Sequence, residues 1–446
     1  MFNDFGVVKA MQRMTSSGGT ILAALALAGP ATAQTPAAHV RSLADHPTVR
    51  SALEAVVEMD DRTVADLIRL TEIAAPPFME GERAEVYAEW LREAGADSVY
   101  IDDEGNAVAT RRGRGGPNGV VDGRRKVVAI SGHLDTVFPP DLDVTVTQRG
   151  DTLFAPGVGD DTRGLVAVLA VLRALEEAGV ETQSDVLIIG TVGEEGLGDL
   201  RGMKYLFRDG ADPIDAWIDL DGTGIGRIIN KGLGSYRYRV TYRGAGGHSW
   251  GAFGLASPAH ALGRAIRHFQ DAADELTRSG PRTSYNVGRM GGGTSVNSIP
   301  FEAWMEVDMR SVSPASLDRI DAAFKAAMER ALEEENALRR DGSAIELDLD
   351  KIGDRPSGEI PDDHSLVERA AAAIRLMDRE PELGRSSTDS NIPISLGIPA
   401  VTIGSGGTGG GAHSPGEWWI NTDGHLAIQA ALLTLVAEAG LSETVP

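Results

Sequence analysis

The stretch "DVLIIGTVGEEG", residues 185–196, is an apolar run that ends in two adjacent glutamates. A short continuous apolar run predicts a strand that is buried on both faces. Three further stretches share this pattern: "KVVAISGHLDTV" (126–137), "DAWIDLDG" (215–222) and "IPAVTIGSG" (398–406). Helical patterns such as "RGLVAVLAVLRALEEAG" (163–179) alternate with them. We therefore predict an α/β fold in which helices sandwich a mostly parallel sheet.

The pattern changes between about residues 235 and 354. Stretches such as "YRYRVTYRG" (236–244) alternate apolar and polar residues, and the elements follow a β-α-β-β-α-β order. This order is typical of a ferredoxin-like α+β module. We predict that residues 235–354 form an inserted lid or dimerisation domain, which divides the catalytic domain into residues 45–234 and 355–446.

The first 33 residues have the pattern of a signal peptide. Lys9 and Arg13 precede the short apolar stretch "GGTILAALALAG" (18–29), and Ala31-Thr32-Ala33 matches a small-x-small cleavage site. We expect cleavage near Ala33 and a periplasmic or secreted mature protein that is not attached to the membrane. The alternatives are a disordered alanine-rich tail and a start codon that has been assigned too far upstream.

Composition limits the chemistry. The chain has 446 residues, a formal net charge of -23, and a sequence pI near 4.8. An acidic surface of this kind argues against binding to nucleic acid or anionic membranes. Because the sequence contains no cysteine, a thiolate nucleophile and thiolate metal ligands are excluded. Histidine, aspartate and glutamate must hold any metal ion.

Acids and histidines follow the predicted strands, and a glycine-rich loop adds one more histidine. They are His133, Asp135, Asp160, Asp161, Glu194, Glu195, Asp219, Asp221 and His413. Taken alone, each of these residues has an ordinary explanation. The glutamate pair can be a solvated turn, and His413 can be an ordinary residue of a glycine-rich loop. In open α/β sheets, however, strand ends gather at one edge and bind ligands there. Imidazoles and carboxylates without thiols suit zinc or a related divalent ion.

The motifs "SGHLDTV", "GDDTRG", "GEEG", "LDG" and "GGAHSPGE", preceded by "EIAAPPFMEGE", occur in this order along nearly the whole mature chain. They resemble the dizinc exopeptidase family of peptidase T, glutamate carboxypeptidase and aminoacylase. The resemblance implies two zinc ions per chain, with cobalt or manganese as alternatives. It implies five metal ligands: His133, Asp160, Glu195, Asp221 and His413. Asp160 would bridge the ions.

The same resemblance implies that Glu194 is the general base and that Asp135 orients His133. Two choices within the motifs stay open. Thr162 and Arg163 depart from the family's usual pattern after the aspartate pair, so Asp161 remains an alternative to Asp160. Asp219 likewise remains an alternative to Asp221, which is preferred because Gly222 follows it.

The inserted domain contributes a second set of candidates. "GAGGHSWGAFG" contains His248, "GGGTSVNSIP" contains Asn297, and "VDMRS" contains Arg310. The resemblance implies that His248 is an oxyanion donor and that the protein is a homodimer; whether His248 acts in its own subunit or across the interface stays open. Asn297 and Arg310 would bind substrate, since a guanidinium binds a free carboxylate through two hydrogen bonds. Asp389 is expected near the pocket without a catalytic role.

We therefore expect a secreted, metal-dependent hydrolase that cleaves amide bonds of peptides as an exopeptidase. One alternative is an amidase or deacylase of N-acyl amino acids. Another is a catalytically silent binding protein, although keeping both Glu194 and the full ligand set speaks against it.

Overall fold

The computed structural model describes residues 34–442. The predicted signal peptide, residues 1–33, lies outside the described residues and stays a prediction. None of the helices within residues 34–442 combines the length and apolar character that crossing a membrane requires.

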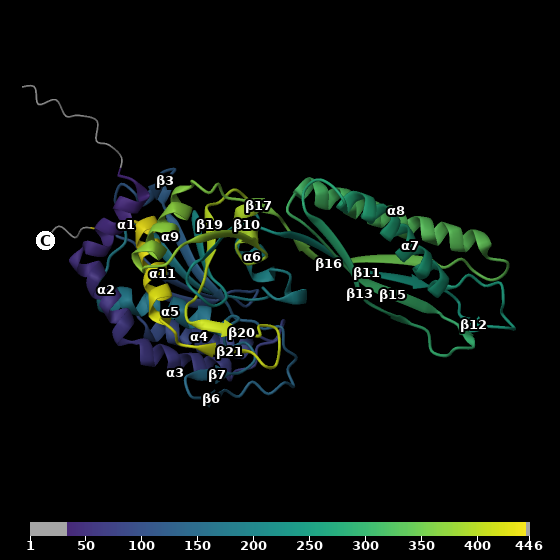
Figure 1. Cartoon of the computed structure of the whole chain (residues 1–446), viewed down its shortest axis with the longest axis horizontal. Coiled ribbons are helices and arrows are strands. Elements are labelled where there is room, and N and C mark those ends of the chain that lie inside the picture. Colours follow the sequence, from purple (N-terminus) through teal and green to yellow (C-terminus); the bar gives the residue numbers. More distant parts are fainter. Residues whose placement is uncertain (1–33, 443–446) are drawn as a thin grey trace, which may run out of the picture. The chain divides into compact units, whose positions relative to one another are not determined.

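A nine-stranded sheet forms the centre of the main domain (Figure 1). Its strands, in spatial order, are β1 (Ser98–Ile101), β2 (Ala107–Arg111), β8 (Asp185–Thr191), β5 (Val127–His133), β9 (Ala216–Leu220), β19 (Ala400–Ile403), β10 (Arg227–Gly232) and β17 (Gly358–Glu359), with β18 (Glu382–Ser386) also beside β10. The four strands β8, β5, β9 and β19 pair in parallel. At the flanks, β1 pairs antiparallel with β2, β2 with β8, β10 with β19 and β17 with β10, whereas β18 pairs in parallel with β10.

The α/β fold class is therefore confirmed: the centre of the sheet is parallel, as predicted, and antiparallel strands make the sheet mixed at its flanks. A hairpin connection explains the antiparallel pairing of β1 with β2, because two strands joined by a short turn must run in opposite directions. The parallel centre is the part that matters for function, since it places the carboxyl ends of its strands at one edge.

Helices pack around this sheet. They are α1 (Pro36–Asp45), α2 (Pro47–Glu58), α3 (Asp60–Thr71), α4 (Gly81–Glu93), α5 (Thr162–Glu177), α6 (Arg201–Leu206), α9 (Ser365–Leu376), α10 (Asn391–Ser395) and α11 (Gly424–Ala439), with a 3₁₀ turn at Gly196–Gly198. Helix α5 contacts β5, β8 and β9. Its residues are apolar on nearly all sides, and those from Thr162 to Leu175 are buried. A helix of this kind belongs in the interior of a protein.

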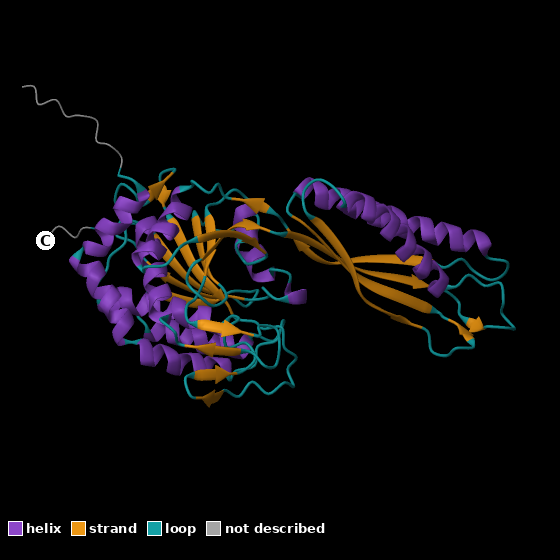
Figure 2. Ribbon diagram, in the orientation of Figure 1, coloured by secondary structure: helices purple, strands orange, loops and turns teal. Residues whose placement is uncertain are grey.

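The inserted residues form a second sheet with its own apolar core. Its antiparallel strands are β13 (Thr283–Gly292), β15 (Glu302–Ser311), β11 (Gly234–Arg243) and β16 (Glu346–Arg355), in this order. Helices α7 (Pro258–Thr277) and α8 (Pro314–Leu338) cover one face (Figure 2). Buried residues alternate along β15 because only that face is covered. This is the predicted ferredoxin-like arrangement, and a short pair, β12 (Gly247–His248) and β14 (Ser298–Ile299), extends from it.

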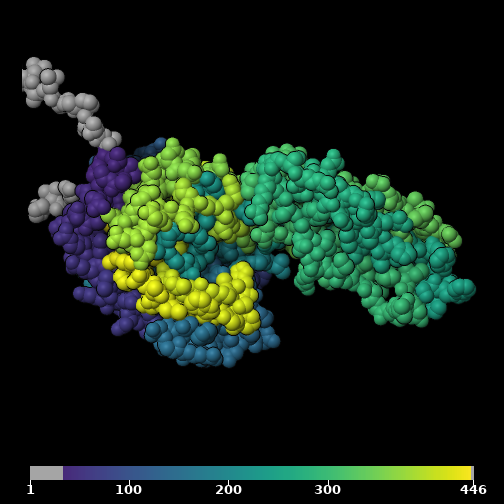
Figure 3. Space-filling model, in the orientation of Figure 1, coloured from purple at the N-terminus to yellow at the C-terminus, as the bar shows by residue number. Residues whose placement is uncertain are grey.

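A small sheet beside the main domain's central sheet connects distant parts of the chain. It contains β20 (Thr408–Gly410), β21 (Trp418–Ile420), β7 (Thr152–Phe154) and β6 (Thr147–Arg149), while β3 (Val120–Val121) pairs with β4 (Arg124–Arg125) elsewhere. β21 pairs with β7, so the yellow C-terminal segment lies beside the blue one on the surface in Figure 3. The loop between β20 and β21 carries His413.

Candidate metal centre

The candidate site lies at the edge where the parallel strands end. His133 is the last residue of β5, Glu194 and Glu195 follow β8, and Asp221 follows β9. β5 pairs in parallel with both β8 and β9. The carboxyl ends of three neighbouring strands therefore bring these four side chains to one place.

Asp160 lies between two histidines. Its Oδ1 is 3.2 Å from Nε2 of His133, and its Oδ2 is 3.2 Å from Nε2 of His413. The same nitrogen of His413 lies 2.8 Å from Oε1 of Glu195. One carboxylate thus contacts both imidazoles, which is the position that a ligand shared by two ions requires.

Potential ligand atoms form three groups in which the atoms lie within 4.8 Å of one another. The groups are His133, Asp160 and Asp221; Asp160, Glu195 and His413; and His133, Glu194 and Glu195. The five predicted ligands are therefore brought together, with Glu194 beside them. Two of the groups share Asp160, and their nitrogen and oxygen donors are those that zinc and similar ions bind.

The cluster contains more negative charge than its surroundings balance. Burial, followed by the charge of Asp160, raises the pKa of Asp221 to about 7. Hydrogen bonds to Asp160 and Glu195 raise the pKa of His413 to about 10. Buried carboxylates require a proton or a cation as partner. The residues present thus fit a divalent metal centre.

The two alternative acids point away from these groups. The carboxylate of Asp161 accepts a hydrogen bond from the backbone N–H of His133 at 3.0 Å and caps the N-terminus of α5. Asp219 accepts a hydrogen bond from the hydroxyl of Ser131 at 2.7 Å. The peptide bond between Asp160 and Asp161 is cis. The structure therefore brings Asp160 into the cluster and gives Asp161 and Asp219 supporting contacts.

Asp135 connects the first histidine to the glutamate pair. Its two carboxylate oxygens accept hydrogen bonds from the backbone N–H groups of Glu194 and Glu195, at 3.0 and 2.7 Å. Its Oδ1 lies 3.6 Å from Nδ1 of His133, and its carbonyl oxygen lies 2.9 Å from the same nitrogen. A single fully buried residue thus fixes the imidazole and both glutamates, as expected for a group that orients a metal ligand.

Glu417 supports the loop that presents Asp160, and the sequence reasoning did not single it out. Its carboxylate accepts hydrogen bonds from the backbone N–H groups of Gly157, Gly159 and Asp160, at 2.7, 2.8 and 2.9 Å. Glu417 is buried, and burial raises its pKa to about 7. The only sequence signal was its place in the "HSPGE" motif, four residues after His413.

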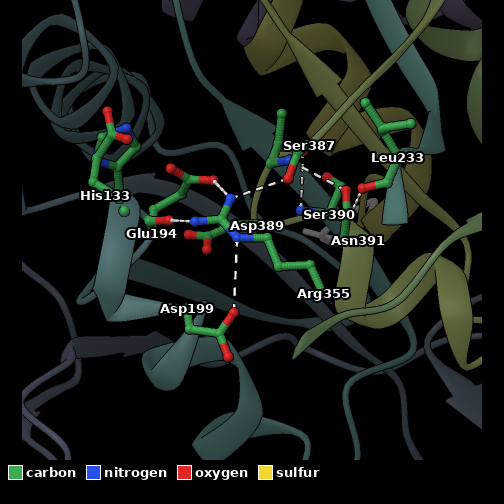
Figure 4. A network of polar contacts seen from close by, with 12 residues as sticks. His133, Glu194, Asp199, Leu233, Arg355, Ser387, Asp389, Ser390 and Asn391 are labelled. Carbon is green, nitrogen blue, oxygen red and sulfur yellow. Dashed lines mark hydrogen bonds and ion pairs between the residues drawn. The ribbon is translucent and has the colours of Figure 1, made fainter. Parts of the chain in front are cut away.

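Arg355 is the second functional candidate that sequence reasoning missed. Figure 4 shows its guanidinium beside Glu194, where its Nη1 lies 3.0 Å from Oε1. Both side chains are buried. Burial raises the pKa of Glu194 well above its ordinary value, although the charge of Arg355 acts in the opposite direction. No motif marked this arginine, which lies 161 positions from its partner.

A cavity of about 570 Å³ opens over the cluster. It is lined by Asp160, Glu194, Glu195, Asp221, His413 and Glu417, and by the arginines Arg227, Arg237, Arg310 and Arg355. Arg310, which the sequence predicts to bind substrate, is thus among the residues that line the cavity. Among the described residues that line the cavity, His248 and Asn297 do not appear. Asp389 is buried and accepts a hydrogen bond from Thr191.

His248 and Asn297 lie together on the inserted domain. The backbone N–H of Ser249 donates to the carbonyl oxygen of Asn297 at 2.9 Å, next to the pairing of β12 with β14. Both side chains are exposed. Nδ1 of His248 accepts local hydrogen bonds from the backbone N–H groups of Trp250 and Gly251, at 3.2 and 3.3 Å.

The mixed α/β fold and this cluster define a metal-dependent hydrolase. The chain belongs to peptidase family M20/M25/M40, whose model matches residues 129–439. Members of this family hydrolyse amide bonds, and this protein is such an enzyme.

Individual relatives are distant. The uncharacterized protein YqjE of Bacillus subtilis (strain 168) is 26% identical over 356 residues, which cover 78% of this chain and 91% of YqjE. Acetylornithine deacetylase of Myxococcus xanthus is 26% identical, over 83% of this chain and 92% of the relative. The crystal structure of aminopeptidase PepT from Bacillus cereus ATCC 10987 superposes with a TM-score of 0.63 at 22% identity, over 85% of this chain and 98% of PepT. At this identity the superposition shows the shared fold alone.

Proposed function

We propose that the protein is an exopeptidase-type hydrolase of peptide amide bonds that uses two divalent ions and Glu194 as general base. The observation that carries the proposal is the pair of ligand groups that share Asp160, with the Glu194 carboxylate beside them. His133, Asp160 and Asp221 would hold one ion, and Asp160, Glu195 and His413 the other. Zinc suits these donors, with cobalt or manganese as alternatives.

When bound, such ions supply Lewis acidity and make water more acidic. Glu194 accepts the proton of the attacking water and passes it to the departing amine. Asp135 keeps His133 and the glutamate loop in place through the hydrogen bonds described above. The buried position of Glu194 favours this role, because burial makes a carboxylate a better proton acceptor.

Arg310 would bind a carboxylate of the substrate. It lines the cavity, and its Nε donates to Asp308 at 2.8 Å. His248 and Asn297 would complete the site from the partner subunit of a homodimer, His248 as oxyanion donor and Asn297 as a substrate contact. Their exposed position, apart from the cavity of their own chain, supports this proposal.

The second candidate is an N-acyl amino acid deacylase. Similarity to acetylornithine deacetylase extends over 83% of this chain and favours it. A panel of di- and tripeptides and N-acyl amino acids, analysed by mass spectrometry, separates the two activities. We expect release of terminal residues from peptides, about two metal ions per chain, and loss of activity on chelation. Full activity with one ion would contradict the two-ion mechanism, and a protein that binds the panel without cleaving it would be a silent binding protein.

We also propose export to the periplasm or the medium, on the pattern of residues 1–33. Mass spectrometry of the N-terminus of the protein from its native host should find a new end near Ala33. An intact N-terminus in the cytoplasm would contradict export.

A further inference from the structure

Both connections of the inserted domain contact the loop that carries the paired glutamates. At the start of the domain, Nη1 of Arg237 on β11 donates to the carbonyl oxygen of Gly196 at 2.7 Å. At its end, the backbone N–H of Asp354 on β16 donates to the carboxylate of Asp199 at 2.9 Å. Residues 194–199 are therefore hydrogen-bonded to the inserted domain at both of its connections.

Arg355, the last residue of β16, makes the contact with the proposed general base itself. Its Nη1 contacts Oε1 of Glu194 and the hydroxyl of Ser387, each at 3.0 Å, and its Nη2 donates to the carbonyl oxygen of Glu194 (Figure 4). Arg355 is only 4% exposed. Its Nε finds no hydrogen-bond partner among the described residues and lies 4.0 Å from Asp199.

The two hydrogen bonds from Arg355 restrict the orientation of the Glu194 side chain, which attraction between opposite charges alone would not do. One guanidinium contacts the side chain and the backbone of the same residue, so it fixes the direction of the carboxylate relative to the loop. The planar fork of arginine holds both contacts in a fixed geometry, whereas the ammonium of lysine is a compact charge whose three donors rotate. The backbone of Arg355 in turn pairs with Ser235 on β11, which joins it to the sheet of the inserted domain.

We propose that Arg355 is a positioning residue that aligns the Glu194 carboxylate. Because Arg355 belongs to β16, the alignment of Glu194 then depends on the position of the inserted domain. The proposal rests on the function proposed above, in which Glu194 is the base. A movement of β16 carries Arg355 with it and thereby shifts the carboxylate. Arg355 lines the cavity, so a direct contact with the substrate is the competing role. Its bonds to Glu194 and its burial favour positioning.

Kinetics of Arg355→Met and Arg355→Lys separate these roles. Misplacing a reacting group by about 1 Å costs about 100-fold in rate, so we expect kcat of Arg355→Met to fall by that order while KM and metal content stay near the wild type. Arg355→Lys should recover only part of the loss. An increase in KM with kcat unchanged would overturn the proposal and make Arg355 a substrate ligand.

The double variant Glu194→Gln/Arg355→Met tests whether Arg355 acts through Glu194. We expect it to turn over no more slowly than Glu194→Gln alone, because the carboxylate to be aligned is already gone. A further loss as large as in the wild-type background would overturn the proposal. Arg385→Met is the matched control: Arg385 donates to the carbonyl oxygens of Gly232 and Gly358 at the same junction, at 2.7 and 3.3 Å. We expect it to leave kcat unchanged.

Hydrogen–deuterium exchange provides a measurement that needs no substrate. In the metal-loaded protein, Arg355→Met and Arg355→Lys should raise exchange of the amides in residues 194–200, and Arg385→Met should not. Unchanged exchange in both Arg355 variants would overturn the proposal even if the enzyme is a peptidase. If the wild type cleaves no amide in the panel but exchange rises as expected, the proposed function fails while the contact between the inserted domain and the loop stands.

Discussion

Glu194 and Glu195 are adjacent in the chain but contact different partners. Glu194 lies 3.0 Å from Arg355, and Glu195 lies 2.8 Å from His413. Glu194→Gln should keep both ions while turnover falls about 10²–10⁴-fold, because an amide cannot accept a proton from water. Glu195→Gln should lose affinity for one ion, because a neutral amide is a poor zinc ligand. Metal content and rate, measured for both variants with and without excess zinc, check this; the opposite pattern would mean that the roles are exchanged.

Glu417 allows a second test at the scale of one residue. Its three bonds to backbone N–H groups hold the loop of Asp160, and an amide in Glu417→Gln can accept through only one of its two polar atoms. We expect metal affinity to fall about 10–100-fold, the usual effect of losing a group that orients a ligand. Competition with a chromogenic chelator measures this. The exposed Glu382→Gln is the control, and equal affinity in both variants would show that the loop does not need Glu417.

At the scale of elements, the site depends on how closely helix α5 approaches strand β9. A Cβ atom at Gly164 would lie 2.3 Å from the Asp161 carboxylate and 2.3 Å from the carbonyl oxygen of Leu220. Gly164→Ala should therefore lower the free energy of unfolding by about 1–3 kcal/mol and weaken metal binding, as measured by urea denaturation and metal analysis. Gly263→Ala in helix α7 is the control, because no described atom lies within 4 Å of the new Cβ. Gly263→Ala should stabilise the protein by up to about 1 kcal/mol. If both variants change the free energy of unfolding equally, the close approach of α5 to β9 is contradicted.

Sequence patterns predict the elements that carry the cluster, because continuous apolar strands and amphipathic helices leave local signals. They also predict that His133, Glu195 and Asp221 meet, since neighbouring parallel strands end at the same edge. They do not predict that β2 pairs antiparallel with β8 or that β10 pairs antiparallel with β19, because these pairings join segments that are distant in the sequence. Arg355 and Glu417 were missed for the same reason: their contacts join segments 161 and 257–260 residues apart, and neither residue type indicates its partner.

At the scale of the whole molecule, the inserted domain exposes apolar side chains beside its predicted functional residues. Trp250 is 87% exposed and Phe253 is 72% exposed, in the segment that follows His248. Val296, next to Asn297, is fully exposed. Exposed apolar clusters of this kind mark contact surfaces on soluble proteins, which favours an interface between subunits at this position.

If His248 acts across that interface, two inactive variants should complement each other. His248→Ala alone should lose about 10²–10³-fold in turnover while keeping its metal, as expected for an oxyanion donor. In an equal mixture of His248→Ala and Glu194→Gln chains that has been allowed to exchange subunits, half of the dimers are mixed. Each mixed dimer has one site with an intact Glu194 and an intact His248 from the partner, so we expect about a quarter of wild-type activity. Sedimentation establishes the dimer, and a mixture of wild-type and Glu194→Gln chains, which should keep half of wild-type activity with or without exchange, controls for effects of the mixing procedure itself. A monomer in solution, or a mixture no more active than its two components, would mean that His248 does not act from a second subunit.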